Sequence, residues 1–295
     1  MKILVTGCHG QVGHALTQHL QGLGEIHAVG REQLDLSRAE SIRAVMQSLK
    51  PAMVINAAAY TAVDQAESEE ALALRINAEA PGILAEEAKK IGASLIHYST
   101  DYVFDGSKQG AWTEDDTVSP LSAYGRSKLL GEQAIAATGV PHLILRTSWV
   151  YAAHGSNFAK TMLNLAQERD RLTVIDDQWG APTGAELLAT VTADVLRQIG
   201  LTGNEALAGL YHLAASGETT WHAYATHIIS EAKVLRPDLP WAVQAIAPVP
   251  SSAFVTAALR PHNSRLNTAK LQAAFGINLP DWRQGVDEML AHVLA

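Results

Sequence analysis

Short apolar runs alternate with longer amphipathic segments through the first half of the chain. The apolar runs predict buried strands at Lys2–Thr6, Ile26–Val29, Met53–Ala57, Ser94–Ser99 and His142–Thr147. The longer segments predict helices at Gln11–Gly22, Arg38–Leu49, Ser68–Lys90 and Ser122–Ala137. Pro81 lies near the middle of the third helix and predicts a kink there. Strands that alternate with helices in this way indicate an α/β fold, with a parallel sheet covered by helices on both faces.

The pattern changes after about Trp149, where helical segments are separated by loops that contain proline. Helices are predicted at Asn157–Glu168, Glu186–Ile199, Trp221–Leu235, Thr268–Phe275 and Trp282–Leu294, and short strands at Leu172–Ile175 and Leu210–Ala214. We therefore expect residues 1–149 to form the main α/β domain and residues 150–295 to form mainly a smaller C-terminal lobe. A segment near residues 184–215 is expected to return to the main sheet.

Composition and charge narrow the classes of protein that fit this pattern. The chain has 295 residues, of which 47% are hydrophobic and 18% charged, as in an ordinary globular protein. The net charge of −8 disfavours binding to the phosphate backbone of a nucleic acid. No apolar run approaches the ~20 residues that cross a bilayer, so no membrane association is expected. With Cys8 as its one cysteine and no secretory signal at its start, the chain is expected to be cytoplasmic.

Three glycines, Gly7, Gly10 and Gly13, stand three residues apart between the first predicted strand and the first predicted helix. Glycine allows a positive φ and a close approach of the backbone to a ligand, and the third glycine lets the helix pack tightly on the strand. The N–H groups at the start of the helix, together with its positive dipole end, can bind a pyrophosphate. This context predicts a dinucleotide site in a doubly wound sheet of the Rossmann type.

The end of the second strand distinguishes the two nicotinamide dinucleotides. A site for NAD usually places Asp or Glu there to bind the ribose 2′-hydroxyl, whereas this chain has Gly30 followed by Arg31. Arg31 can pair with a 2′-phosphate, so the pattern favours NADPH. NADH stays the alternative if Arg31 is only a solvated surface residue. Asp35 and Leu36 follow the strand and are expected at the adenine end of the site.

Tyr124 and Lys128 lie four residues apart, which places them on one face of a predicted helix. A nearby ammonium favours the phenolate and so lowers the pKa of a tyrosine from its usual value of ~10. Tyr124 could then give a proton to a ketone oxygen while a nicotinamide gives the hydride. Thr100 follows the fourth strand, at the edge where parallel sheets bind ligands, and its hydroxyl can hold the carbonyl group. Ser99 is the competing candidate for that role.

With these features in this order, the chain resembles the extended short-chain dehydrogenase/reductase family, and within it the enzymes that reduce a 4-keto sugar carried on dTDP. The resemblance covers nearly the whole chain and is carried by Gly7–Gly13, Asn56–Asp64, Ser99–Gly106, Tyr124–Lys128, Arg146–Tyr151, Asn157–Phe158, Asp177–Thr183 and Arg260–Leu266. It implies hydride transfer from NADPH to C4 of dTDP-4-dehydro-β-L-rhamnose, as the last step in making dTDP-L-rhamnose. Tyr124 would be the proton donor, Lys128 would lower its pKa, and Thr100 would orient the carbonyl.

The resemblance also implies that residues 1–149 bind NADP(H) and that residues 150–295 mainly bind the substrate. The cofactor-binding residues would be Gly7, Gly10, Gln11, Val12, Gly13, Arg31, Asp35, Leu36, Ala59, Tyr60, Thr61, Tyr98, Tyr124 and Lys128. The substrate-binding residues would be Thr100, Asp101, Trp149, Asn157 and Arg260. Three of these have simpler alternatives: Tyr98 and Trp149 could be core residues, and Arg260 could pair with a neighbouring carboxylate.

Other functions fit the same motifs. A reductase for a different sugar nucleotide or an epimerase of this fold would carry them, and so would a regulatory subunit similar to that of methionine adenosyltransferase. Some members of the family form a homodimer around a Mg²⁺ ion held by glutamates. One of these glutamates is replaced by Ala15 in this chain, although Glu186 remains, so no metal site is expected and a homodimer stays an open question.

Overall fold

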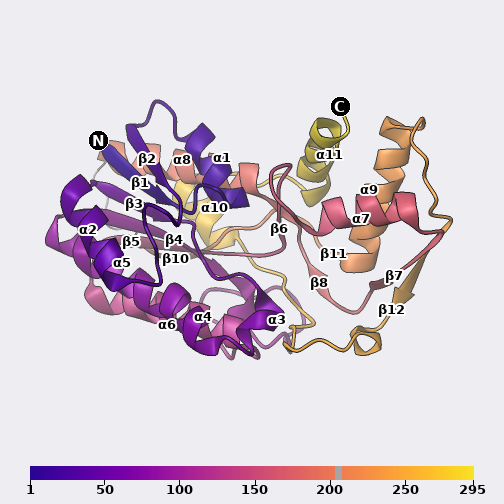
Figure 1. Cartoon of the computed structure of the whole chain (residues 1–295), viewed down its shortest axis with the longest axis horizontal. Coiled ribbons are helices and arrows are strands. Elements are labelled where there is room, and N and C mark those ends of the chain that lie inside the picture. The colour runs from indigo at the N-terminus through magenta and orange to yellow at the C-terminus, as the bar shows by residue number, and fades with distance from the viewer. Residues whose placement is uncertain (203–207) are drawn as a thin grey trace.

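A central sheet of parallel strands organises the computed structural model, which describes residues 1–202 and 208–295. Its six strands are β1 (Lys2–Thr6), β2 (Glu25–Val29), β3 (Met53–Asn56), β4 (Ser94–Thr100), β5 (His142–Thr147) and β10 (Gly209–His212). Their order across the sheet is β10-β5-β4-β3-β1-β2, and each neighbouring pair is parallel (Figure 1). This arrangement confirms the predicted doubly wound α/β fold of the Rossmann type.

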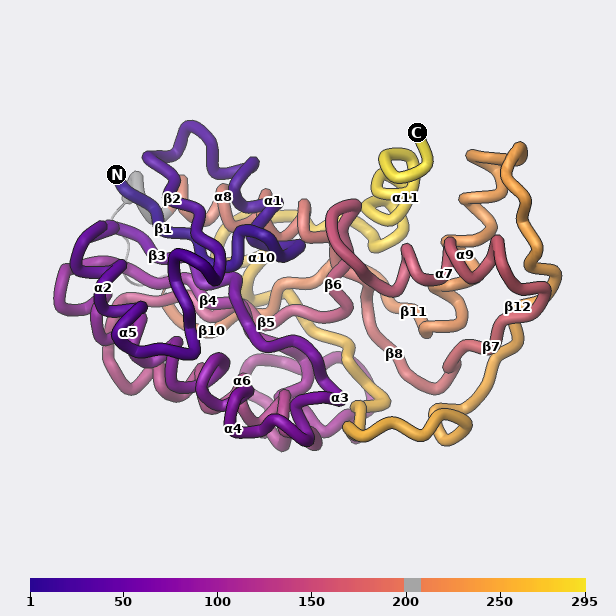
Figure 2. Tube along the Cα trace, in the orientation of Figure 1, coloured from indigo at the N-terminus to yellow at the C-terminus, as the bar shows by residue number. Residues whose placement is uncertain are grey.

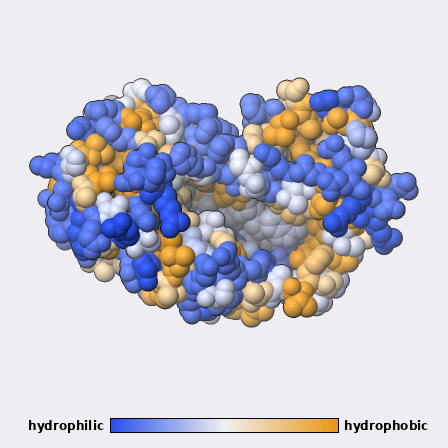
Figure 3. All heavy atoms as spheres, in the orientation of Figure 1, coloured by the Kyte–Doolittle hydropathy of each residue, from blue (hydrophilic) through white to orange (hydrophobic). Residues whose placement is uncertain are grey.

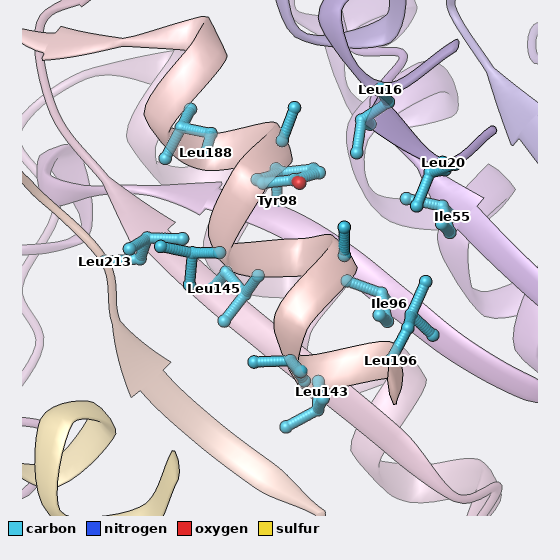
Figure 4. Packing of buried hydrophobic residues seen from close by; sticks show 14 of the residues in the cluster. Leu16, Leu20, Ile55, Ile96, Tyr98, Leu143, Leu145, Leu188, Leu196 and Leu213 are labelled. Carbon is cyan, nitrogen blue, oxygen red and sulfur yellow. The ribbon is translucent and has the colours of Figure 1, made fainter. Parts of the chain in front are cut away.

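Helices cover both faces of this sheet. On one face lie α1 (Gln11–His19), α8 (Ala185–Thr202) and α10 (Ala269–Phe275), and on the other α2 (Ala39–Leu49), α5 (Ala80–Lys90) and α6 (Ala123–Thr138). Alternate residues of each strand point to opposite faces, so Ile96 and Tyr98 pack beneath α8 while Leu95 packs beneath α5. Figure 4 shows the first of these layers, with Leu188 and Leu196 of α8 directed onto the strands.

The crevice for a ligand is set by the point at which the strand order reverses. The chain passes from β1 to β2 on one side and then crosses back to β3 on the other side of β1. The loops that follow β1 and β3 therefore diverge at the carboxyl edge of the sheet, and ligands of open α/β sheets bind in that opening. The glycine turn follows β1, so the topology places it in the crevice.

A smaller lobe is built from the C-terminal part of the chain. Its elements are β6 (Val150–Tyr151), α7 (Phe158–Glu168), β7 (Arg171–Ile175), β8 (Trp179–Gly180), β9 (Thr183–Gly184), β11 (Thr219–Thr220), α9 (Trp221–Leu235), β12 (Ala245–Val249) and α11 (Trp282–Val293). Figure 2 shows residues beyond β12 running back along the edge of the molecule toward α3 (Val63–Ala66). The lobe has its own apolar cluster around Tyr224, Trp282 and Leu290.

Three elements within the C-terminal half belong to the main domain. Helix α8 packs on α1, β10 pairs with β5, and α10 packs on β10. Residues 203–207 of the returning segment near 184–215 lie outside the described residues. Strand β12 was not predicted, since Pro248 interrupts an otherwise strand-like run and its partner is only the short β7.

The long helix predicted over residues 68–90 is interrupted. It consists of α4 (Glu70–Leu74), a π-helical turn (Arg75–Glu79) and α5, with Pro81 at the start of α5. Proline has no N–H group, so the turn before it can widen without losing a hydrogen bond at that position. The widened turn brings Asn77 inward, where its side chain bonds to the Tyr60 backbone and to the Ser127 hydroxyl. No helix of the described residues has the length and apolar character needed to cross a membrane.

Candidate active site

Helix α6 carries Tyr124 and Lys128 close to the carboxyl edge of the sheet. Its first turn is capped by Ser122, whose hydroxyl accepts a hydrogen bond from the Gly125 N–H at 3.1 Å. A Cβ atom on Gly125 would lie 2.3 Å from the Tyr102 carbonyl oxygen, and one on Gly131 would lie 2.1 Å from that of Asn77. These two glycines therefore allow α6 to approach the segment after β4 and the π-helical turn more closely than any other residue would.

Tyr124 meets Thr100 at the end of β4. The Thr100 side chain lies next to the Tyr124 phenol, and the Tyr102 ring packs edge-on against Tyr124 with centroids 5.8 Å apart. Burial raises the pKa of Tyr124 to about 12; the Thr100 side chain lowers it in part, and the nearby Asp101 raises it. The expected lowering of this pKa by Lys128 is not among these effects, and burial holds Tyr124 in its protonated form.

Lys128 is buried, with only 2% of its surface exposed. Its ammonium group donates to the Tyr98 carbonyl oxygen at 2.6 Å and lies 3.2 Å from His97 Nε2. Burial lowers the pKa of Lys128 to about 8, and Glu132, one turn further along α6, opposes this shift. The lysine is thus fixed by contacts on β4 and titrates closer to neutral pH than a solvated lysine does.

A buried chain of hydrogen bonds continues from Lys128 across the sheet. His97 Nδ1 lies 3.0 Å from the Asn56 amide nitrogen, and the Thr6 hydroxyl donates to Asn56 Oδ1 at 2.6 Å. Thr6 in turn accepts the N–H of Ala58, in the loop after β3. None of His97, Asn56 and Thr6 was predicted to be a site residue, although a histidine inside an apolar strand and polar residues at two strand ends were a usable signal.

Three polar residues, Ser99, Thr100 and Asp101, follow one another at the end of β4. Thr100 donates to Asp101 Oδ1 at 3.2 Å and accepts the N–H of Tyr102, whereas the Ser99 hydroxyl has no partner among the described residues. Burial raises the pKa of Asp101 to about 7, and a hydrogen bond to Ser264 lowers it in part. Of the two candidates for the carbonyl-holding hydroxyl, Thr100 is the one that contacts Tyr124.

The glycine turn has the conformation that a pyrophosphate site needs. Gly7 has φ +70°, and a Cβ atom on Gly13 would lie 2.0 Å from the Gly7 carbonyl oxygen. Gly10 is the N-cap of α1 and offers no side chain to the first N–H groups of the helix, which leaves them directed into the crevice. Asn157 caps α7 and donates to Gln11 Oε1 at 2.9 Å, which joins the smaller lobe to this turn. Val12 packs against the core beside the turn.

Charged side chains surround the end of β2. The Arg31 side chain is 79% exposed and its nearest carboxylate, Asp35, lies 3.8 Å away. Asp35 accepts hydrogen bonds from Ser37, and Leu36 is buried in the core beside α2. Glu32 pairs with His9 of the glycine turn at 3.1 Å, so a carboxylate does stand near this strand end, two residues beyond Gly30.

The loop after β3 is held by the π-helical turn. The Tyr60 backbone N–H bonds to Asn77 Oδ1 at 2.8 Å and its hydroxyl to Glu69 at 2.8 Å, which fixes the path of Ala59, Tyr60 and Thr61. Tyr98 lies in the apolar core, where its hydroxyl bonds to Thr192 of α8 (Figure 4). Its side chain is thus a core side chain, while its carbonyl oxygen holds Lys128.

A cavity of about 750 Å³ lies mainly in the smaller lobe and reaches Tyr102 in the segment after β4. Its lining includes Tyr102, Trp221 and Arg260, together with apolar residues of α7 and β7. Figure 3 shows the molecule hollowed between the part that holds the sheet and the part that holds α7 and α9. Arg260 pairs with both carboxylate oxygens of Asp64, at 2.5 and 3.1 Å, so the predicted alternative of an ion pair is present at the edge of this cavity.

Trp149 follows β5 in a left-handed conformation, with φ 47°. Its ring stacks on Trp221 with centroids 3.7 Å apart and lies over Gly180, where a Cβ atom would approach it to 2.6 Å. A non-glycine residue held at positive φ costs ~1–2 kcal/mol. In this conformation the indole lies at the junction of the two lobes, where Trp221 and Gly180 contact it. Trp149 is half-buried and lines a small cavity that Gln11 and Asn157 also line.

Among the described residues, no group of three or more His, Cys, Asp or Glu side chains is arranged to hold a metal ion. Glu186, the glutamate noted in the sequence, lies 2.5 Å from His19 Nε2. The question of a metal and of a homodimer stays as the sequence left it.

Comparison with known proteins identifies the family. The sequence model described as "RmlD substrate binding domain" matches residues 1–295. The dTDP-4-dehydrorhamnose reductase of Escherichia coli is 49% identical over 98% of this chain and 97% of its own length. That of Burkholderia thailandensis is 46% identical over 97% of each.

A solved structure agrees with these matches. The crystal structure of dTDP-4-dehydrorhamnose reductase from Bacillus anthracis in complex with NADP superposes with a TM-score of 0.87 at 33% identity and covers 99% of both chains. This chain belongs to the RmlD family, together with these dTDP-4-dehydrorhamnose reductases.

Proposed function

We propose that this chain reduces dTDP-4-dehydro-β-L-rhamnose to dTDP-L-rhamnose with NADPH. The observation that carries the proposal is that Thr100 and Tyr124 lie together at the end of β4, with Lys128 one turn further along the helix that carries Tyr124. A hydroxyl, a protonated phenol and a buried ammonium are the groups that ketone reduction requires. The family supports the choice of substrate, since relatives at 46% and 49% identity are named as reductases of this sugar.

The crevice fits a dinucleotide. The tight approach at Gly13, the positive φ of Gly7 and the uncapped start of α1 are the features that a bound pyrophosphate uses. Gly10, Gln11 and Val12 would hold the pyrophosphate, residues 59–61 would lie beside the adenosine, and Lys128 would bind the nicotinamide ribose. When bound, NADPH supplies the hydride. The B. anthracis relative, which forms a complex with NADP, supports this choice of cofactor.

The chain's own residues would handle the proton and the charge. Tyr124 is held protonated by burial, so it is ready to donate to the oxygen that develops negative charge at C4. Thr100, next to Tyr124, would orient the same oxygen. Lys128 places a positive charge on the same face of α6 and would favour the phenolate that Tyr124 becomes.

The sugar nucleotide would bind mainly in the smaller lobe. Trp149 and Asp101 would contact the sugar at the junction of the lobes, and Asn157 would lie beside the glycine turn through Gln11. Arg260 would reach the diphosphate from its pairing with Asp64, because Arg forms strong contacts with phosphate oxygens. In this arrangement residues 1–149 bind the cofactor and residues 150–295 provide most of the substrate site.

The direct test is consumption of NADPH in the presence of dTDP-4-dehydro-β-L-rhamnose, followed by absorbance. We expect turnover that depends on both compounds and yields dTDP-L-rhamnose. The same sugar carried on UDP is the matched control for the nucleotide. Conversion of the sugar without net loss of NADPH would instead indicate an epimerase, and no reaction with any sugar nucleotide would contradict the proposal.

Arg31→Ala tests the choice of cofactor. Because Arg31 is exposed and pairs with Asp35 only at 3.8 Å, we expect its loss to raise the KM for NADPH by about three- to tenfold through loss of a contact to the 2′-phosphate. The KM for NADH should stay unchanged, since NADH has only a hydroxyl at that position. Steady-state kinetics with both cofactors measure this difference, and an equal rise for both would rule out the assigned contact.

A further inference from the structure

The buried chain Thr6–Asn56–His97–Lys128 joins the loop after β3 to the lysine of the site. Its side chains are shielded from solvent, with exposed fractions of 1% for Thr6, 1% for Asn56 and 0% for His97. Each link is within hydrogen-bond distance, from the Ala58 N–H to Thr6 at one end to His97 Nε2 and Lys128 Nζ at the other. Buried polar groups of this kind must find consistent donors and acceptors.

The direction of the hydrogen bonds follows from the Thr6 end. The Ala58 N–H can only donate, so it donates to the Thr6 hydroxyl oxygen. The Thr6 hydrogen then points to Asn56 Oδ1, 2.6 Å away, which leaves the Asn56 NH₂ group directed at His97 Nδ1. A neutral imidazole that accepts at Nδ1 carries its proton on Nε2, and Nε2 is the atom that faces Lys128.

The reverse orientation of the Asn56 amide is disfavoured. It would place the NH₂ group against the Thr6 oxygen, which already accepts from Ala58, and would leave the Thr6 hydrogen without its acceptor at Oδ1. A buried hydroxyl without an acceptor costs ~1–3 kcal/mol. A protonated His97 is disfavoured too, because burial and the nearby Lys128 both lower the pKa of His97.

We propose that His97 is a positioning residue that holds Lys128 and sets its protonation state, through a tautomer that Thr6 and Asn56 fix. With its proton on Nε2, His97 can donate a hydrogen bond to the neutral amine of Lys128. It disfavours the ammonium form, because the Nε2–H group would then face a group that can only donate. Lys128 would therefore exchange a proton near neutral pH, where it can act on Tyr124 four residues away.

The charged and titratable surroundings agree with this proposal. On α6 the Glu132 carboxylate favours the ammonium form of Lys128, yet Glu132 is already paired with Arg146 of β5 at 2.6 Å. Tyr124 lies on α6 itself, and other titratable groups at its ends or in the segment after β4 include Glu67, Glu70, Lys89, Asp101 and Tyr102. Burial lowers the pKa of Lys128 to about 8. An opposing donor at His97, 3.2 Å away, would act in the same direction.

The tautomer of His97 can be read directly in the unsubstituted protein. In a sample labelled with ¹⁵N-histidine, NMR distinguishes a ring nitrogen that bears a proton from one that does not. We expect the His97 signals, identified by their loss in His97→Gln, to show a proton on Nε2 and none on Nδ1. A proton on Nδ1 would overturn the proposal. This measurement needs no substrate, so its outcome is independent of the proposed function.

Thr6→Val removes the hydroxyl at nearly constant shape and frees the Asn56 amide to rotate. His97 would then donate from Nδ1 to Asn56 and accept at Nε2 from the Lys128 ammonium. We expect the NMR signals to show the changed tautomer. The kinetic test rests on the proposed function. In the unsubstituted protein we expect kcat/KM for the keto sugar to fall with an alkaline limb near pH 8. In Thr6→Val this limb should move up by about one pH unit.

Two matched variants separate this effect from a general loss of packing. Thr6→Ser restores the hydroxyl and should restore both the tautomer and the pH profile. Thr147→Val removes another buried hydroxyl at a strand end, one without a partner among the described residues, and should leave both unchanged. An unchanged tautomer and profile in Thr6→Val would refute the proposal, and so would a shift of the same size in Thr147→Val.

Discussion

Tyr124→Phe is expected to lower kcat by ~10²-fold or more, since it removes the group that donates a proton to the developing alkoxide. The phenol lies against Thr100 and burial holds it protonated, so it is placed to give that proton. The ring itself would remain, along with its edge-on contact to Tyr102. Binding of NADPH should therefore change little.

The measurement is single-turnover reduction of the keto sugar, with NADPH binding followed separately by fluorescence. Tyr224→Phe is the matched control, because its hydroxyl is buried and has no partner among the described residues. That control should turn over at the normal rate. Near-normal turnover in Tyr124→Phe would show that another group donates the proton and would remove the basis for the proposed mechanism.

The fold was predictable because the apolar runs, the helical periodicity and the glycine turn all indicated the same α/β architecture. Apolar runs at β1, β3, β4 and β5 and the glycine turn after β1 are local signals that need no knowledge of distant contacts. Strand β12 was missed because its partner β7 lies about seventy residues earlier and nothing in its own sequence outweighs Pro248. The π-helical turn was missed for a related reason: proline predicts that a helix is disturbed, but not which way the chain turns.

The site was predictable only where its residues follow a strand end or share a helix face. Thr100, Tyr124 and Lys128 meet these conditions, and the structure brings Thr100 and Tyr124 into contact. The pairing of Arg260 with Asp64 joins residues 196 positions apart, and no local pattern reveals such a partner. The pKa of Tyr124 was expected to fall from proximity to a lysine, yet it rises to about 12 because burial depends on packing that the sequence does not display.

Glu132→Ala is expected to lower the free energy of unfolding by ~3–5 kcal/mol, the largest effect on stability that we expect from a single substitution here. Glu132 accepts two hydrogen bonds from Arg146, at 2.6 and 2.9 Å, and the two side chains are only 6% and 4% exposed. Without the carboxylate the guanidinium would stay buried and unpaired beside the Phe104 ring. Urea unfolding measures the loss. Glu70→Ala breaks an exposed pair with Arg126 and should cost no more than ~1 kcal/mol.

The same substitution acts on Lys128 in the direction opposite to that expected for Thr6→Val. The Glu132 charge raises the pKa of Lys128, so its removal should move the alkaline limb of the pH profile below pH 8 rather than above it. Replacing both partners, Glu132→Met with Arg146→Leu, should recover most of the stability, because no charge is then left buried and unpaired. It should not restore the pH profile. A double variant that recovers both would mean that the ion pair acts on the site only through packing, and that the charge of Glu132 has no separate effect on Lys128.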